Sequence, residues 1–320
     1  MGTRPRLVVH FVPSACQTRR SPSSAVTLVP AGRSFTGIAD GSLDVLDVLL
    51  RRQRSRSKPG ARGDPHRVAL VVEGGGMRGA YTAGMVDALA QLGLRDSFDV
   101  VYGTSAGAFS GLVFAANGAH GASSIYSEFL SGAQFINYRR LRTGSGPLMN
   151  LRYLTDEVLT RNRPLDFGEI CEGNISVRLV ATSLASGRPS VFSDLATTVE
   201  WKTALRASAC VPLLAGRPVT FRRARWIDGS ISERIALSRA IRDEATHVLV
   251  LRSRVADTVG PHIPRTAYAR VLNVRPYIHC GVRPLTTSAA MLAHASQVGA
   301  RAVLQTFSRD LGSEGENSLG

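Results

Sequence analysis

Lysine is almost absent from this basic chain. Of the 39 basic residues among 320, only Lys58 and Lys202 are lysines, and 24 acidic residues leave a net charge of +15. A basic surface attracts nucleic acid or anionic lipid headgroups, and net charge does not choose between them. Aromatic residues make up only 6% and do not interleave with the arginine runs, so base-stacking platforms are not evident. We therefore expect no specific nucleic-acid partner.

Cysteine is also scarce. Cys16, Cys171, Cys210 and Cys280 lie far apart, with no CxxC pair and no His/Cys cluster at metal spacing. This spacing indicates a reduced compartment and no metal site. Cys16 follows small residues, as a lipoprotein cysteine would, but Pro13 stands where a bulky apolar residue is wanted. We expect no lipid attached there.

The sequence also predicts neither a signal peptide nor a transmembrane helix. The apolar stretch of residues 7–12 is short, contains His10 and is closed by a proline. The uncharged run Val100–Ser127 is long enough for a bilayer, but its glycines and serines, with Asn117 and His120, argue against a span. These features predict a cytoplasmic protein, with peripheral membrane contact left open. Nothing in the sequence predicts the oligomeric state.

Residues 1–66 predict a basic, largely flexible N-terminal extension. Up to residue 67 the chain has 12 basic and 4 acidic residues, a surplus of 8. Within it, Ser42–Gln53 is a candidate amphipathic helix, with leucines at helical spacing and Ser42 as the N-cap. Such a helix either docks on the following domain or anchors the chain to a membrane.

From Arg67 onward, short β-branched runs alternate with helical patterns, which is typical of an α/β fold with a parallel sheet. We predict a catalytic domain over residues 67–254 and a C-terminal helical and loop segment over 255–320 with a disordered tail. Strands are predicted over 67–73, 98–103, 175–183, 217–227 and 246–251, and helices over 77–92, 106–117 and 238–243. Tyr126–Phe167 is predicted to be helical and loop-rich, with clustered arginines. Together with the C-terminal segment it is the candidate cap and groove that would select the substrate.

The first motif is EGGGMRG, Glu73–Gly79, between a strand and a helix. Its glycines allow successive backbone N–H groups to face one anion near a helix N-terminus. Gly74, Gly76 and Gly79 also match the dinucleotide fingerprint GxGxxG. That alternative needs an acidic residue at the end of the second strand, where this chain has Gly103, Thr104 and Ser105.

The second motif is GTSAG, which matches the GxSxG nucleophile elbow and has the required strand before it and helix after it. Gly103 and Gly107 supply the small residues that so sharp a turn needs. Ser105 is then held at the carboxyl end of the strand near a helix N-terminus, which favours negative charge in an acyl-transfer transition state. Ser105 is the candidate nucleophile.

The third motif is DGS, Asp228–Ser230. An Asp-Gly pair alone most often marks a tight turn. A serine hydroxyl, however, needs a base within hydrogen-bond reach, and a compact loop at the carboxyl edge of the sheet can bring Asp228 to Ser105.

With these three motifs in this order, the chain resembles the bacterial branch of the patatin-like phospholipase family over roughly Arg67–Arg252. Further similarity lies in VATSLASGRPSVFSD (180–194) and RASACVPLL (206–214). The resemblance implies a patatin-like three-layer α/β/α fold with a mainly parallel central sheet. It also implies a serine acyl hydrolase that cleaves lipid acyl esters.

The resemblance further implies roles for single residues. Ser105 would be the nucleophile and Asp228 its base, in a dyad without histidine. Gly75 and Gly76 would offer oxyanion-hole N–H groups, within a loop that also contains Gly74 and Gly79. Arg78 matches a basic residue of the family's loop and would steady it or meet anionic substrate. No cofactor or metal is needed.

This chain departs from the family at Ser230, because the family usually has DGG or DGA there. The hydroxyl could change how Asp228 is hydrogen-bonded and so its basicity. Two alternatives stay open. A Ser-His-Asp esterase would use one of the histidines downstream of the acid, at positions 247, 262, 279 and 294. A lipid-binding or regulatory module would keep the fold without activity.

Overall fold

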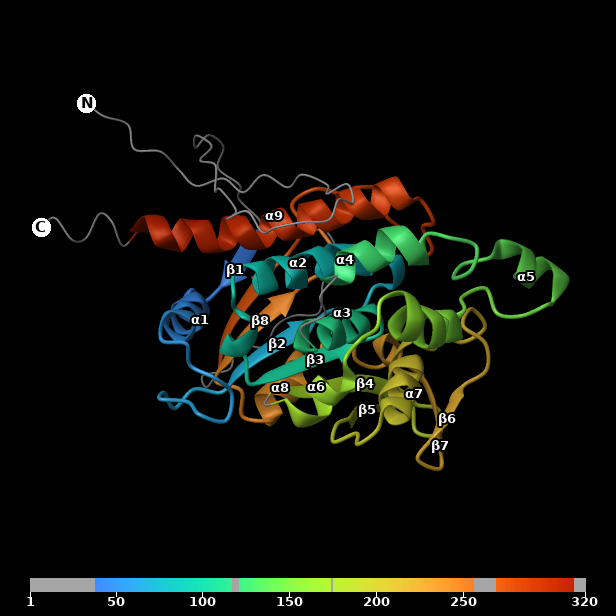
Figure 1. Cartoon of the computed structure of the whole chain (residues 1–320), viewed down its shortest axis with the longest axis horizontal. Helices are drawn as coiled ribbons and strands as arrows, with labels where there is room; N and C mark the ends of the chain where they lie inside the picture. The colour runs from blue at the N-terminus through green and yellow to red at the C-terminus, as the bar shows by residue number, and fades with distance from the viewer. Residues whose placement is uncertain (1–37, 117–120, 174, 256–268, 314–320) are drawn as a thin grey trace, which may run out of the picture. The chain divides into compact units, whose positions relative to one another are not determined.

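The computed structural model describes residues 38–116, 121–173, 175–255 and 269–313. These residues lie in one compact unit, Gly37–Gly320. Helices cover both faces of a central sheet, as Figure 1 shows. The predicted three-layer α/β/α fold with a mainly parallel centre is confirmed.

Nine strands of the described residues form the sheet, in the order β1-β9-β8-β2-β3-β4-β7-β6, with β5 paired to β4. Their bounds are β1 Ala39–Gly41, β2 Val68–Val72, β3 Val100–Thr104, β4 Ser176–Ser183, β5 Pro189–Phe192, β6 Val219–Phe221, β7 Ala224–Asp228, β8 His247–Leu251 and β9 Arg270–Val274. The five strands from β9 to β4 run parallel, and the remaining pairings are antiparallel. The carboxyl ends of β2, β3 and β8 therefore meet at one edge.

The single strand predicted over residues 217–227 is wrong. The segment is a hairpin of β6 and β7, and it reverses at Arg222 and Arg223, whose φ angles are 48° and 60°. Two successive residues with positive φ make the tight turn that suits a hairpin. Arginine is not a residue that marks such a turn in sequence, so the reversal was hidden.

The α-helices are α1 Asp44–Arg54, α2 Gly79–Gln91, α3 Ala106–Ala115, α4 Gly121–Ile125, α5 Tyr138–Thr143, α6 Phe167–Glu172, α7 Thr198–Ala209, α8 Leu237–Arg242 and α9 Ala289–Ser313. Short 3-10 turns are η1 Gly76–Arg78, η2 Arg95–Ser97 and η5 Gly229–Ile231, and the π-helices are η3 Tyr126–Leu130 and η4 Tyr153–Asn162. The other predicted strands and helices lie within a few residues of these bounds.

The central strands are apolar on both faces because helices cover both. Every residue of β2, β3 and β8 is buried, as expected for parallel strands between two helical layers. Leu70 and Val72 of β2 pack in the larger core with α1, α2, α3 and α9, whereas Ala69 and Val71 face the smaller core with α8.

Helix α2 is buried on nearly all sides. Its outer side is covered by α9 (Figure 1). A Cβ on Gly84 of α2 would collide with the Ser296 carbonyl of α9, and one on Gly299 of α9 would collide with the Tyr81 carbonyl. Glycine at both positions lets the two backbones approach closely, so the C-terminal segment is part of the core.

Residues 38–66 are folded, which corrects the prediction of a flexible extension for this part. β1 pairs with β9, and α1 buries Leu46 and Leu49 in the larger core. Helix α1 thus docks on the following domain, which is the first of the two interpretations given for it above. The N-cap is Leu43 without a side-chain hydrogen bond, so the prediction of Ser42 as the cap is wrong. Residues 1–37, with Cys16, lie outside the described residues.

No helix among the described residues is long and apolar enough to cross a membrane. The run Val100–Ser127 instead contains β3, α3 and part of the helical segment that follows. The predicted disordered tail, residues 313–320, lies outside the described residues except for Ser313 at the end of α9.

Candidate active site

Ser105 stands alone between the end of β3 and the start of α3. Its backbone has φ 55° and ψ −121°, a conformation that non-glycine residues rarely adopt. A Cβ on Gly103 would lie 2.5 Å from Ala108 Cα, and one on Gly107 would collide with the Val72 carbonyl. Only glycine fits at these two positions, so the motif builds the sharp strand–turn–helix connection that the sequence predicted.

Asp228 reaches Ser105 from the end of β7. The Ser105 Oγ donates a hydrogen bond of 2.6 Å to Asp228 Oδ2. The other carboxylate oxygen accepts from the backbone N–H of Ser230 at 2.7 Å, and the Asp228 N–H donates to the Cys210 carbonyl at 2.8 Å. Asp228 therefore forms a tight turn and faces the serine, and both sequence interpretations of the Asp-Gly pair hold.

Both side chains are withdrawn from water. Ser105 is 6% exposed and Asp228 2% exposed. Burial raises the pKa of Asp228 above its ordinary value, although the hydrogen bonds from Ser105 and from the Ser230 N–H oppose the rise. Burial, and the nearby Asp228 charge, also raise the pKa of the Cys210 thiol to about 11. The Asp228 carboxylate is thus a stronger base than an exposed aspartate.

The glycine loop lies directly against Ser105. A Cβ on Gly74 would be 3.2 Å from Ser105 Cβ, and Gly76 has φ 58°, in the left-handed region that favours glycine. Gly79 leaves no room for a side chain beside Tyr126. The Gly75 and Gly76 N–H groups donate to no other residue within the described parts of the chain. The loop therefore has donors available next to the serine.

Glu73, the residue before the glycines, is fully buried and was not singled out by the sequence. Its carboxylate accepts from Arg234 Nε at 2.8 Å, Arg252 Nε at 3.1 Å and the Ser253 N–H at 2.7 Å. These bonds tie the start of the loop to the ends of neighbouring segments. A charged residue that closes a buried apolar strand was the signal that could have identified it.

Arg78 is half-buried within the loop, and its Nε lies 3.4 Å from the Gly75 carbonyl. Burial, and then the positive charges of Arg254 and Arg234, lower the pKa of its guanidinium. The contact with Gly75 fits the expected role of steadying the loop. The surplus of positive charge beside the loop fits the other expectation, which is contact with anionic substrate.

Ser208 is a second residue that the sequence did not single out. Its hydroxyl accepts from the Ser105 backbone N–H at 3.0 Å and donates to the Val180 carbonyl at 2.6 Å. Ser208 and Val180 lie in the two further segments that carry the family resemblance. A single buried hydroxyl thus connects the strained residue to α7 and β4.

The Ser230 hydroxyl is buried and makes no hydrogen bond of regular geometry within the described residues, although it lies near enough to Asp228 to oppose the rise of that carboxyl's pKa. A Cβ on Gly74 would collide with this hydroxyl. Glycine is therefore required at position 74, because a side chain there would collide with Ser230 and would crowd the nucleophile elbow at Ser105.

The described histidines do not reach the dyad. His247 starts β8 at the amino edge, paired in register with Val68, and its pKa is lowered by burial and by the neighbouring His66. Neither His279 nor His294 forms a hydrogen bond with Ser105 or Asp228. His262 lies outside the described residues.

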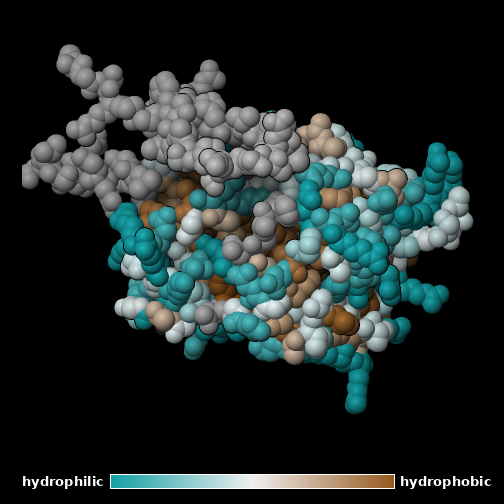
Figure 2. Space-filling model, viewed as in Figure 1, coloured by the Kyte–Doolittle hydropathy of each residue, from teal (hydrophilic) through white to brown (hydrophobic). Residues whose placement is uncertain are grey.

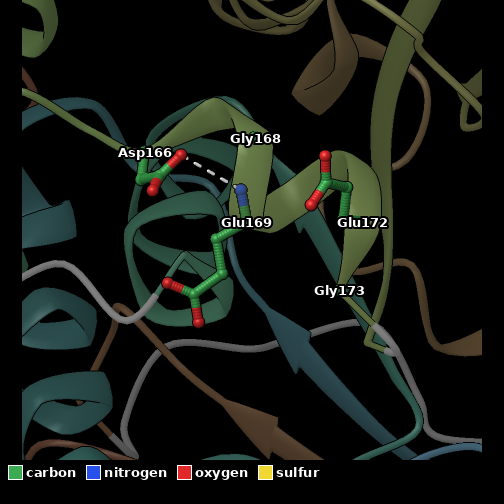
Figure 3. A pocket seen from close by; sticks show the side chains of 5 residues that line it. All are labelled: Asp166, Gly168, Glu169, Glu172 and Gly173. Atoms are coloured by element: carbon green, nitrogen blue, oxygen red, sulfur yellow. Dashed lines mark hydrogen bonds between the residues drawn. The ribbon is translucent and has the colours of Figure 1, made fainter.

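A separate pocket lies at α6, away from these motifs. Figure 3 shows its lining, which consists of Asp166, Gly168, Glu169, Glu172 and Gly173. The Asp166 carboxylate caps the helix by accepting from the Glu169 N–H at 3.1 Å, and Glu169 pairs with Arg95 at 2.6 Å. Asp166 and Glu169 thus have structural partners, and no cluster of ligands for a metal occurs among the described residues.

The chain is similar to known proteins across the segment that holds these motifs. The Patatin-like phospholipase family profile matches residues 70–241, which is more than half of the chain. The uncharacterized protein YjjU of Escherichia coli (strain K12) is 30% identical over 192 residues, 59% of this chain and 52% of YjjU. The chain thus spans about half the length of that relative.

Two solved structures are similar at lower identity. VipD from Legionella pneumophila matches at 13% identity and a TM-score of 0.40, covering 76% of this chain and 67% of VipD. Human GIVD cytosolic phospholipase A2, in complex with methyl gamma-linolenyl fluorophosphonate, matches at 11% and 0.43, covering 89% and 67%. Similarity at this level does not extend to substrate. The match over residues 70–241, with its three motifs gathered at one sheet edge, places the chain in the patatin-like phospholipase family.

Proposed function

We propose that the protein is a serine acyl hydrolase that cleaves lipid acyl esters with Ser105 as nucleophile and Asp228 as base. The observation that carries the proposal is the 2.6 Å hydrogen bond from Ser105 Oγ to a buried carboxylate. A buried aspartate of raised pKa accepts a proton more readily than an exposed one. The serine also lies beside a helix N-terminus and a loop with available N–H groups.

In the first step the Ser105 oxygen bonds to the ester carbonyl carbon while its proton passes to Asp228. Negative charge develops on the carbonyl oxygen, where the N–H groups of Gly75 and Gly76 and the N-terminus of α3 stabilise it. The intermediate then expels the alcohol, which takes the proton from Asp228, and an acyl-enzyme remains.

In the second step water attacks the acyl-enzyme, and Asp228 takes the water's proton. The intermediate collapses, the Ser105 oxygen recovers the proton, and the fatty acid leaves. Ser208 is a positioning residue in this scheme because its hydroxyl holds the Ser105 backbone. No cofactor takes part in either step.

Two substitutions test the scheme. We expect Ser105→Ala and Asp228→Asn each to lower kcat/KM for a p-nitrophenyl acyl ester by at least about 10³-fold, in line with the loss of a triad member in other serine hydrolases. A fluorophosphonate probe should label the unmodified chain and leave the Ser105→Ala variant unlabelled. Retained hydrolysis in either variant would exclude the dyad. An unlabelled Ser105 in a folded chain would instead indicate a module without activity.

The substrate class follows from a second experiment. We propose phospholipase A or lysophospholipase activity, and a panel of phospholipids, lysophospholipids and neutral lipids, with the Ser105→Ala variant as blank, would measure it. Release of fatty acid from phospholipid or lysophospholipid supports this assignment. Release from neutral lipid alone would retain the chemistry and change the substrate.

A further inference from the structure

The rim around the dyad is formed by three segments that come from distant parts of the sequence. The Tyr138 hydroxyl of α5 donates to the Leu285 carbonyl at 3.0 Å, and the neighbouring Pro284 carbonyl accepts from Met77 of the glycine loop. At the other side, the Met149 N–H donates to the Leu214 carbonyl at 2.8 Å. Leu214 belongs to the turn that follows Cys210, the backbone partner of Asp228.

All three segments have basic residues and no acidic ones. Residues 129–155 contain four arginines, residues 201–227 contain five arginines and a lysine, and residues 276–288 contain Arg283, without any Asp or Glu. The exposed side chains of Arg139, Arg142, Arg217 and Arg283, here called the arginine rim, make no ion pair with described residues. Figure 2 shows hydrophilic residues projecting at the α5 end of the molecule.

Apolar side chains stand within this basic rim. Leu213 is 87% exposed and has φ 67°, so a bulky apolar residue occupies a strained backbone position in full contact with water. Tyr138 is 55% exposed beside the arginines of α5, and Ile231, three residues after Asp228, is 56% exposed. The exposure of these apolar side chains to water does not stabilise the folded protein in solution.

We propose that the arginine rim, with Leu213 and Tyr138, is the surface by which the protein docks on an anionic lipid bilayer. Arginines near such a surface are attracted by its negative potential, and an exposed leucine gains free energy by entering the headgroup and acyl boundary. The pairing of apolar tips with unpaired arginines fits a lipid surface better than a nucleic acid, which offers no apolar layer. The inference that docking turns Ser105 toward its substrate rests on the proposed function. The docking on a bilayer does not depend on that function.

Vesicle sedimentation of the full chain with Ser105→Ala, which leaves the lipids intact, tests the docking. We expect binding to vesicles of phosphatidylcholine with phosphatidylserine, and much weaker binding to phosphatidylcholine alone. Neutralising Arg139, Arg142 and Arg217 to Gln should weaken binding about a hundredfold, at roughly fivefold per arginine. The matched control replaces Arg51, Arg56 and Arg301, which lie elsewhere on the surface, with Gln. An equal loss in the control would overturn the proposal.

The Leu213→Asn variant separates docking from folding. Asparagine adopts left-handed backbone more readily than leucine, so the variant should fold at least as well. We expect its vesicle affinity to fall about tenfold, since the leucine no longer enters the bilayer. Val199→Asn, at an exposed position nine residues before Ser208 on α7, should bind normally.

Hydrolysis of a soluble ester distinguishes this surface from the active site. In chains that keep Ser105, the rim and Leu213 variants should hydrolyse p-nitrophenyl acetate within about twofold of the unmodified rate while losing vesicle binding. Unchanged vesicle binding by both variants would overturn the proposed docking surface, whether or not Ser105 and Asp228 are shown to be the catalytic dyad. Oligonucleotide binding that depends on the arginines, with vesicle binding indifferent to Leu213, would assign the rim to nucleic acid and also overturn the proposal.

Discussion

Two aspartates at opposite ends of the central sheet, Asp99 and Asp228, have different kinds of partner. At the amino end, Asp99 accepts from Arg52 at 2.8 Å, from Arg62 at 2.7 Å and from the Val68 N–H, and Arg52 also binds Asp64. At the carboxyl end, Asp228 has no arginine partner and is held by a serine hydroxyl and one backbone N–H. The first arrangement neutralises its charges and joins α1 to the sheet. The second leaves a carboxylate free to accept a proton.

The sharpest test of this contrast replaces one aspartate at each end. We expect Asp99→Asn to lower the free energy of unfolding by about 3 kcal/mol, because it removes one of the two charge partners of the buried Arg52 and also the partner of Arg62. Asp228→Asn should leave that free energy unchanged or raise it, because burial disfavours the native carboxylate. Urea unfolding of both variants measures the difference. Equal losses would mean that the two ends are not distinct.

A smaller effect should follow from Ser208→Ala at the carboxyl end. The substitution leaves the buried Ser105 N–H and the Val180 carbonyl without their partner, which costs about 1 to 3 kcal/mol of stability. Because the hydroxyl orients Ser105, we also expect kcat for a soluble ester to fall about tenfold with KM nearly unchanged. Ser208→Thr, which restores a hydroxyl, is the control. A KM effect alone would contradict a positioning role.

The pH dependence of stability should have opposite signs at the two ends. Arg52 lowers the pKa of Asp64 from 3.8 to about 2, so the stability from this pair is present above pH 3.8 and is lost as pH falls toward 2. The pKa of Asp228 is raised, so the folded state binds its proton more tightly and loses stability as pH rises from 3.8 through the raised value. Comparison with Asp228→Asn isolates the second contribution.

Activity should rise over the same range in which Asp228 deprotonates. The acid limb of kcat/KM for a soluble ester should therefore lie above pH 3.8. An acid limb at the ordinary aspartate value would show that burial does not tune this group.

The smallest expected effect concerns Ser230. Its hydroxyl is buried and makes no hydrogen bond of regular geometry among the described residues, so Ser230→Ala should raise the free energy of unfolding by at most about 1 kcal/mol. We expect kcat/KM to stay within about threefold, since the backbone N–H of residue 230 still binds Asp228. Ser230→Gly should gain less, because glycine increases the freedom of the unfolded chain. A large loss of activity would show that the hydroxyl serves the reaction.

Sequence patterns predicted the parts of the fold that repeat locally. Strands such as β2 and β8 are continuous apolar runs, and the elbow follows from glycines at fixed positions around Ser105. The C-terminal segment was predicted to be helical in part, but the bounds and burial of α9 were not, because its buried side includes Ser296 and Thr306, which break the apolar stripe. Each hydroxyl satisfies itself by bonding the carbonyl four residues earlier, and this is visible only in three dimensions.

The candidate site shows the same limit. Ser105, Asp228 and the glycines are recognisable because their spacing along the chain reflects a local turn. Ser208 and Glu73 act through partners more than 100 residues away, and no local pattern records such pairs. The arginines of α5 were noticed as a cluster, but the contact of α5 with Leu285, next to the residue that binds the glycine loop, is visible only in three dimensions.

The order of the strands has a consequence for synthesis. β2 ends at Val72, yet one of its two neighbours is β8, which starts at His247, and α2 is covered by α9. A nascent chain that has just emerged as far as DGS has made every residue of the proposed dyad, but it still lacks a strand beside the glycine loop and a helix over α2. On the ribosome the nucleophile is therefore made long before its support, and hydrolysis should begin only once α9 has left the exit tunnel.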